Sequence, residues 1–332
     1  MLRYLIRRLF VMIPTLIAIS MLIFVIIQAP PGSFLETYMA EQQSRGEAVD
    51  QSKIDFLRHE YGLDQPLYMQ YLTWATGLIH GDLGYSFEHE MAVSEVVGDS
   101  MWLTVIVTLA STLFVWVVSF PIAIYSAVRQ YSLGDYFFTF LGYIGLATPS
   151  FLLALVLLYC AHLWFGISIG GLMDPAYIGQ AWSWAKLSSV FSHLWVPVLV
   201  IGLPGTAGMI RRLRANLLDE LHKQYVTTAR AKGLSNGRML LKYPLRVSLN
   251  PFISDIGSLL PELISGSVIV SVVMSLPMTG PILLQALRSQ DMYLAGSFLM
   301  FMAFLTVVGV LLSDILLALV DPRIRLGGGN VK

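Results

Sequence analysis

Six long apolar stretches constrain the fold of this 332-residue chain more than any other feature of its sequence. A helix that spans a bilayer needs about 20 predominantly apolar residues, and lipid cannot satisfy the polar edge of an open strand. The sequence therefore predicts an all-α, integral membrane helical bundle with about six transmembrane helices. The stretches lie roughly at residues 9–28, 102–128, 137–165, 194–210, 252–276 and 294–320.

The composition agrees with a membrane protein. Hydrophobic residues make up 56% of the chain and charged residues only 13%, whereas a soluble domain usually carries about a quarter charged residues. The first apolar stretch follows Arg3, Arg7 and Arg8. It is longer than a signal peptide core and no small-residue cleavage site follows it, so we expect a retained helix. We interpret the single cysteine, Cys160, as a small buried apolar residue, and it excludes a disulfide within the chain.

The positions of the basic residues predict the orientation of the chain. Loops rich in Lys and Arg stay on the cytoplasmic side of a membrane. With a cytoplasmic N-terminus, sixteen of the 21 Lys and Arg residues fall in inner segments and five in outer segments. The sequence therefore predicts that both termini are cytoplasmic.

The apolar stretches divide the chain into four parts. Residues 1–28 hold the N-terminal tail and the first transmembrane helix, and residues 29–101 form an external cap segment. Residues 102–320 form a core of five transmembrane helices that includes a cytoplasmic segment at 211–250, and residues 321–332 form a cytoplasmic tail. Most other connections are short, so the two long segments are expected to have structures of their own.

Both long segments carry helical signals. In the external cap segment, apolar residues at 67, 71, 74 and 78 predict an amphipathic helix, and Gly81-Asp82-Leu83-Gly84 predicts a turn. In the cytoplasmic segment, a helix is expected to stop at Gly233, and Ser235 is placed to cap a second short helix. The cytoplasmic segment is thus predicted to form two short helices that meet at a glycine elbow.

Motifs along nearly the whole chain resemble one family. The segment Thr228-Ala229-Arg230-Ala231-Lys232-Gly233-Leu234 is similar to the coupling motif of permease subunits in binding-protein-dependent ABC importers. In particular, the chain resembles the first permease of the dipeptide, oligopeptide and nickel class. Further similar segments follow the family's order: Arg7-Arg8 with Ile13-Pro14-Thr15, residues 61–66, 81–86 and 147–151, and Asp321-Pro322-Arg323-Ile324-Arg325.

The resemblance implies partners and a role for the elbow. It implies that Thr228, Ala229, Arg230, Ala231, Lys232, Gly233 and Leu234 dock into a cleft on an ATPase subunit. It further implies a second homologous permease, two ATPase subunits and an external substrate-binding protein in a bacterial or archaeal cytoplasmic membrane. ATP and magnesium would be bound by the ATPase subunits, and this chain would hold no cofactor. The family takes short peptides most often, and also nickel, oligosaccharides and glycoconjugates.

The fifth apolar stretch carries polar residues on one predicted helix face. Asp255, Ser258, Glu262 and Ser265 are spaced by three or four residues, so they share that face. A carboxylate near the middle of a membrane is costly and usually faces a protein interior or an aqueous path. Two interpretations stay open: the face lines a translocation path, or it makes structural hydrogen bonds to a neighbouring helix. Asp314, in the sixth stretch, is interpreted as structural.

Several other function classes lack the residues that they need. None of the six lysines follows a glycine, so the chain has no phosphate-binding loop and cannot hydrolyse ATP by that route. The basic segment lies between two spans, which favours membrane lipids or a membrane-proximal partner over nucleic acid. A secondary transporter would usually show paired broken helices. No metal-binding motif is present, and we interpret His80, Asp82, Glu88, His89 and Glu90 as a solvated loop.

Overall fold

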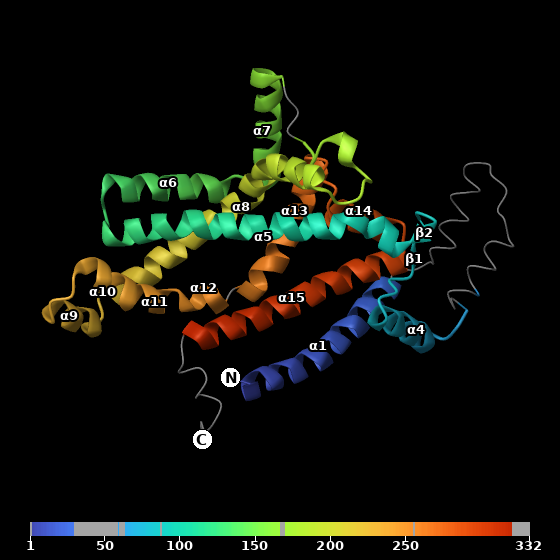
Figure 1. Cartoon of the computed structure of the whole chain (residues 1–332), viewed down its shortest axis with the longest axis horizontal. Helices are drawn as coiled ribbons and strands as arrows, with labels where there is room; N and C mark the ends of the chain where they lie inside the picture. Colours follow the sequence, from blue (N-terminus) through green and yellow to red (C-terminus); the bar gives the residue numbers. More distant parts are fainter. Residues whose placement is uncertain are drawn as a thin grey trace. The chain divides into compact units, whose positions relative to one another are not determined.

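The computed structural model describes residues 2–29, 59, 64–86, 88–166, 170–254 and 256–320. Within these residues the chain is almost entirely helical, with one short hairpin (Figure 1). Several sequence features fall outside them, including residues 30–58 and 60–63 of the external segment, Asp255, and the tail at 321–332.

The elements are α1 (Leu2–Gln28), α4 (Leu67–Ile79), β1 (Tyr85–Ser86), β2 (Met91–Ala92), α5 (Val93–Val128), α6 (Leu133–Ala147), α7 (Ser150–Phe165), η1 (Pro175–Tyr177), α8 (Trp184–Leu221), α9 (Gln224–Ala231), α10 (Asn236–Lys242), α11 (Pro244–Ser248), α12 (Asn250–Ser254), α13 (Ile256–Val273), α14 (Thr279–Arg288) and α15 (Met292–Val320).

The predicted all-α membrane bundle is confirmed. Among the described residues, four helices are long and apolar enough to cross a membrane, and a bent pair raises the number to five. The four lie in α1, α5, α8 and α15. A shorter apolar helix, Ile264–Val273, falls within the fifth predicted stretch. Each of the six apolar stretches in the sequence therefore corresponds to helix in the structure.

The third apolar stretch differs from a straight span because it forms two helices. α6 ends at Ala147 and α7 begins at Ser150, and their axes differ by 99°. Pro149 precedes α7 with extended backbone angles, and Thr148 before it is extended as well. A proline disfavours helical geometry in the residue before it and donates no hydrogen bond, which accounts for the break. By contrast, Pro121, Pro197 and Pro204 lie inside α5 and α8, which continue through them.

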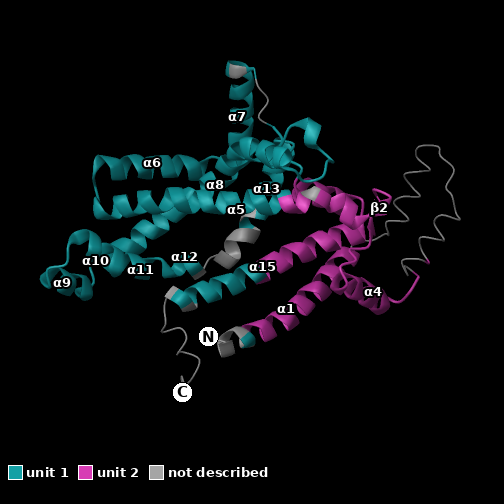
Figure 2. Ribbon diagram, in the orientation of Figure 1, with its two compact units in different colours: residues 1–7, 103–277, 308–332 teal, residues 8–102, 278–307 magenta. Residues whose placement is uncertain are grey.

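The chain divides into two compact units, which Figure 2 colours separately. Unit 1 contains residues Met1–Arg7, Leu103–Pro277 and Val308–Lys332. Unit 2 contains residues Arg8–Trp102 and Met278–Val307. Unit 2 thus joins most of α1 and the described part of the predicted cap to α14 and the first half of α15.

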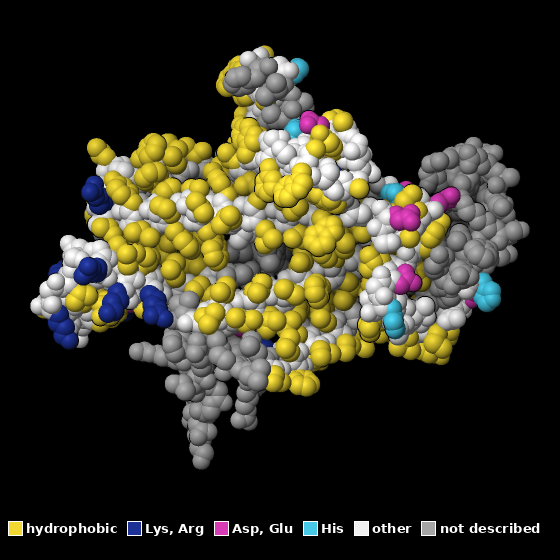
Figure 3. All heavy atoms as spheres, viewed as in Figure 1, with side chains coloured by type: hydrophobic (Ala, Val, Ile, Leu, Met, Phe, Trp, Pro, Cys, Tyr) yellow, Lys and Arg dark blue, Asp and Glu magenta, His cyan; other side chains and the backbone are white. Residues whose placement is uncertain are grey.

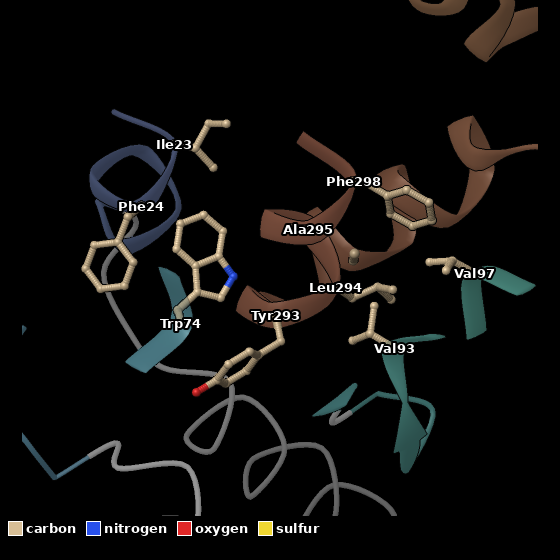
Figure 4. Packing of buried hydrophobic residues seen from close by; sticks show 10 residues of the cluster. Ile23, Phe24, Trp74, Val93, Val97, Tyr293, Leu294, Ala295 and Phe298 are labelled. Carbon is tan, nitrogen blue, oxygen red and sulfur yellow. The ribbon is translucent and has the colours of Figure 1, made fainter. Parts of the chain in front are cut away.

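The core of unit 2 is built around Trp74 of α4. Figure 4 shows its indole between Phe24 of α1 and the start of α15, with Tyr293 and Leu294 close by. Glycine makes this close approach possible, because a Cβ at Gly296 would lie 3.0 Å from the indole ring. The predicted amphipathic helix is confirmed, with Tyr71 and Leu78 packed on the same cluster. Leu67, at its first position, is instead exposed.

Unit 1 packs α5, α6 and α7 against the long helix α8, and small residues allow the close contacts. A Cβ at Gly202 of α8 would lie 2.7 Å from the Phe114 ring of α5. One turn further, the Ser119 hydroxyl donates a hydrogen bond of 3.2 Å to the Thr206 carbonyl oxygen. Small residues and buried hydroxyls are common where membrane helices pack closely.

The connection between α7 and α8 folds back over the end of α13. The Gly171 amide donates to the Met274 carbonyl oxygen at 2.9 Å, and Leu172 is fully buried. Lys186 is also fully buried, although its charge suggests an outer, solvated position. Its ammonium group donates to the Gln180 carbonyl oxygen at 2.7 Å and lies 4.8 Å from the centre of the Trp182 ring.

Candidate functional site: the glycine elbow and the α13 face

The predicted glycine elbow is present between α9 and α10. Gly233 has a φ of +82°, a conformation that residues with a side chain rarely adopt. Its amide donates to the Arg230 carbonyl oxygen at 3.0 Å, and the Leu234 amide donates to the Ala229 carbonyl oxygen at 3.3 Å. This pair of bonds is a Schellman motif, which satisfies the last carbonyls of a helix. Ser235 precedes α10 at the predicted cap position, but its side chain makes no capping hydrogen bond.

A small apolar cluster holds the two helices of the elbow together. Val226 and Ala229 of α9 and Met239 of α10 are buried in it, with Leu234 and Tyr243 packed alongside. Ala229 therefore faces α10 and the inside of the elbow. The outward surface is formed by the other residues of the predicted coupling motif, and the exposed ones are Thr228, Arg230, Ala231, Lys232 and Gly233.

The outward surface is basic and open around its tip. A Cβ added at Gly233 would meet no atom within 4 Å, so the tip has free space around it. Lys and Arg side chains gather over α9 and α10 in Figure 3. Behind the elbow lies a cleft of about 930 Å³, whose lining includes Arg129, His222, Arg230 and Leu240. The surface can therefore contact an acidic partner on the tip and receive a partner side chain behind it.

The elbow is anchored to the C-terminal end of α8. Leu217 of α8 and Leu245 of α11 are buried in one cluster with Ala127 of α5. On the other side of the elbow, the Tyr225 hydroxyl donates to the Glu220 carboxylate. Burial, together with this hydrogen bond, raises the pKa of Tyr225 well above its usual value, so the phenol stays protonated. A force applied to the elbow therefore reaches α8 through packed side chains.

The α13 face that the sequence singled out is described in part. Asp255 lies outside the described residues, and Ser258 belongs to α13 but its side chain is not among those described. Glu262 and Ser265 both present exposed side chains. The Ser265 hydroxyl donates to the Glu262 main-chain carbonyl oxygen at 3.1 Å, one turn back along α13. Both interpretations of this face, as path lining and as helix contact, are compatible with an exposed carboxylate.

The structure also describes Asp314 and His89, which the sequence placed in a span and in a loop. Asp314 is buried in α15, next to Ser313, whose hydroxyl donates to the Ile253 carbonyl oxygen. The amide of His89 donates to the Ser86 hydroxyl at 3.2 Å. In the part of the chain that the structure describes, no group of three or more His, Cys, Asp or Glu side chains could hold a metal ion.

Sequence reasoning missed one buried ion pair in unit 1. Asp135 at the start of α6 accepts two hydrogen bonds from Arg214 of α8, at 2.9 Å and 2.7 Å. The Tyr131 amide also donates to Asp135 at 2.9 Å, while Ser132 caps α6 by accepting from the Asp135 amide. A serine followed three residues later by an acidic residue is typical of the start of a helix, so the sequence could have predicted the cap at Ser132. The partner arginine could not be identified from local pattern, because it lies 79 residues away.

Comparison with known proteins gives matches over nearly the whole chain. A family model described as "Binding-protein-dependent transport system inner membrane component" matches residues 119–326. A model for the N-terminal part of membrane components of binding-protein-dependent transport systems matches residues 1–108. The elbow and α13 both lie within the first of these ranges.

Three curated relatives are similar along their full length. The oligopeptide transport system permease protein AppB of Bacillus subtilis is 34% identical over 97% of this chain and 99% of its own length. The dipeptide transport system permease protein DppB of Escherichia coli K12 is 28% identical over 98% and 99% of the two chains. The glutathione transport system permease protein GsiC of Escherichia coli O6:H1 is 29% identical over 98% and 99%.

Proposed function

Since this chain belongs to the family of inner membrane components of binding-protein-dependent transport systems, we propose that it forms half of the translocation path of an ATP-driven importer. It is a permease component and not a catalytic subunit. The proposal extends this membership to the partners, the substrate and the residues that couple them.

The observation that carries the proposal is the geometry of the elbow. A preformed turn at Gly233 exposes Arg230 and Lys232 on a basic surface, and buried side chains connect this surface to α8. This arrangement suits an ATPase cleft with acidic residues, because opposite charges favour association and the packed connection carries movement to the spans. Thr228, Ala231 and Leu234 flank the tip, and Ala229 supports it from inside the elbow.

We propose short peptides as the imported solutes. The relatives are named as oligopeptide, dipeptide and glutathione permeases, and all three names refer to short peptides or a peptide-like molecule. The alternative is the same machinery importing oligosaccharides, glycoconjugates or nickel, with selection made by the external binding protein. A secondary transporter is less favoured, because the large basic elbow would then have no assigned partner.

The complete importer would contain a second homologous permease, two ATPase subunits and an external binding protein. ATP and magnesium would be bound in the ATPase subunits. Closure of the two ATPases would carry each elbow as a rigid body and open the path alternately to each side. The loaded binding protein would favour the outward-open state through its higher affinity for that state. In this scheme Glu262 and Ser265 line the path together with Ser258 of the same helix and Asp255, which directly precedes α13 in the sequence.

The function is tested by transport in reconstituted vesicles. The chain is co-expressed with its neighbouring transporter subunits, purified as a complex and reconstituted with the cognate binding protein and labelled di- to pentapeptides. Peptide accumulation that requires ATP and the binding protein would support the proposal. Accumulation driven by an ion gradient without ATP would contradict it, and ATP-dependent uptake of nickel or oligosaccharide alone would select the alternative substrates.

A further inference from the structure

A groove runs between α6 and α8 on the surface of unit 1, and the proposed function does not account for it. The groove encloses about 230 Å³. Small residues make it, because Gly142 on α6 faces Ala207 on α8. A Cβ added at Gly142 would still be 3.9 Å from the Ala207 side chain, so space remains between the helices there.

The two helices run antiparallel along the groove. Asp135 contacts Arg214, and seven residues further along α6, Gly142 faces Ala207, which lies seven residues back along α8. The groove therefore follows two full turns of both helices. From Asp135 to Leu146, at its far end, the length is about 16 Å at 1.5 Å per residue.

One end of the groove is polar and cationic. Arg211 and Arg214 both line it there, together with the hydroxyl-bearing Tyr131 and Tyr136. The Arg214 charge is neutralised by Asp135 through two hydrogen bonds. Arg211 is exposed, and among the described residues no side-chain partner is found for it. The polar end therefore carries one net positive charge and several hydrogen-bond donors.

The rest of the groove is apolar and lies in a surface suited to lipid. Its lining beyond the cationic end includes Gly142, Leu146, Ala207 and Ile210. The flanking face of α6 exposes Phe140, Tyr143 and Ile144, which is the kind of surface that membrane helices present to acyl chains. A ligand that fills the groove must therefore be anionic at one end and apolar over the rest of its length of about 16 Å.

We propose that this groove binds an anionic phospholipid of the cytoplasmic leaflet. Its phosphodiester group would contact Arg211 and the tyrosine hydroxyls, and one acyl chain would lie over Gly142 and Ala207. Basic pockets between membrane helices on the cytoplasmic side are known to bind anionic headgroups, and the proposed orientation places Arg211 on that side. A helix of a protein partner is less suited, because it would need an acidic side chain at the cationic end and would have no place for its other side chains.

The proposal is tested by lipid titration of the purified importer. The complex is delipidated in mild detergent, and phosphatidylglycerol or phosphatidylcholine is added while bound lipids are counted by native mass spectrometry. We expect one saturable phosphatidylglycerol site with higher affinity than for phosphatidylcholine. Arg211→Gln should weaken phosphatidylglycerol binding about fivefold, since one basic residue near a membrane surface contributes on the order of that factor. Phosphatidylcholine binding should hardly change.

Two further variants locate the site. Gly142→Leu fills the apolar part and should weaken the binding of both lipids. Arg238→Gln removes another exposed charge, on α10 and outside the groove, and should leave the phosphatidylglycerol preference intact. If Gly142→Leu does not assemble, the comparison of Arg211→Gln with Arg238→Gln still shows whether the phosphatidylglycerol preference depends on the groove.

Three results would overturn the proposal. The first is a wild-type complex without any preference for phosphatidylglycerol. The second is a preference that survives Arg211→Gln. The third is efficient cross-linking of Thr139→Cys, in a Cys160→Ser background, to the second permease, which would show that protein covers the groove. ATP-dependent uptake is measured in parallel, so failure of the lipid site is distinguished from failure of the proposed function.

Discussion

Asp135 and Arg214 form a bidentate ion pair between α6 and α8, and the Asp135 side chain is almost fully buried in it. Removing one partner of such a pair leaves an unpaired buried charge, which costs about 3–5 kcal/mol. We therefore expect Arg214→Leu to destabilise the protein strongly, by somewhat less than this range because a quarter of the Arg214 side chain is exposed.

The paired variant distinguishes charge from packing. Asp135→Asn combined with Arg214→Leu should recover part of the lost stability, because no charge is then left unpaired. Thermal unfolding is measured in one detergent for the wild type, Asp135→Asn, Arg214→Leu and the double variant. The four stabilities together give the coupling energy between the two side chains. Equal stability of Arg214→Leu and the wild type would show that the pair is not important for folding.

Substitution at Gly233 should separate backbone strain from docking. Gly233→Ala adds a Cβ into free space, but its φ of +82° costs about 1–2 kcal/mol. Gly233→Trp adds the same strain and a ring that the proposed ATPase cleft cannot receive. We expect Gly233→Ala to retain measurable peptide-coupled ATP hydrolysis and Gly233→Trp to lose it or to lose the ATPase subunits. Wild-type coupling in Gly233→Trp would contradict the docking assignment.

Substitutions of Glu262 should decide between the two interpretations of the α13 face. If Glu262 lines the path, Glu262→Gln keeps the shape, removes the charge and changes the transport rate in an assembled complex. If Glu262 instead bonds a neighbouring helix, the amide can replace it, whereas Glu262→Leu leaves a buried partner unsatisfied at a cost of about 1–3 kcal/mol. Transport rate and thermal stability are measured for both variants. Normal transport by Glu262→Gln with an unstable Glu262→Leu complex would favour the structural role.

Asp291 should make the stability of unit 2 depend on pH. Its carboxylate accepts hydrogen bonds from Ser86, at 2.6 Å, and from the amides of Glu88 and Leu294. Burial nevertheless raises the pKa of Asp291 above its usual 3.8, so the folded state holds the proton more tightly than the unfolded state does. This contribution to stability is fully present below pH 3.8 and is lost as pH rises through the raised pKa.

The pH dependence is measured against a variant that cannot ionise. Thermal unfolding of the wild type and of Asp291→Asn is compared over a pH series that begins near the usual carboxylate pKa and ends at neutrality. Relative to Asp291→Asn, the wild type should lose stability as pH rises. Asp291→Asn also loses a hydrogen bond, which lowers the stability of the variant at every pH. This loss does not change how its stability depends on pH. If the stabilities of the wild type and Asp291→Asn changed with pH in parallel, Asp291 would have the same pKa in the folded and the unfolded protein.

Cysteine labelling in whole cells tests the proposed orientation. Ser235 lies next to the elbow and Ile178 lies in the connection between α7 and α8, and both are exposed. In a Cys160→Ser background, an impermeant maleimide should label Ile178→Cys and not Ser235→Cys in intact cells. After permeabilisation it should label both. The reverse pattern in intact cells would invert the topology.

Local periodicity made much of the fold predictable. The apolar stretches, the stripe that includes Tyr71 and Trp74, and the stop at Gly233 all depend on residues close in sequence. The break at Pro149 was predictable as a kink, but its 99° angle depends on how α7 packs against α8 and α13.

Features that depend on distant contacts were missed. Lys186 was counted only as a basic residue of an outer segment, and its burial against the Trp182 ring and the Gln180 carbonyl group was not foreseen. The family resemblance implied that Ala229 lies on the docking surface. Its position inside the elbow is set by α10, which folds back over it.

The Schellman motif at Gly233 has a consequence for the speed and cost of assembly. Because its own main-chain hydrogen bonds and the cluster around Ala229 fix the elbow, a partner meets a preorganised shape. Little conformational entropy remains to be lost on binding, so more of the contact energy is left for affinity. Association with an acidic cleft would then be limited by diffusion and steering, and its rate would fall as ionic strength rises, while the dissociation rate would change much less.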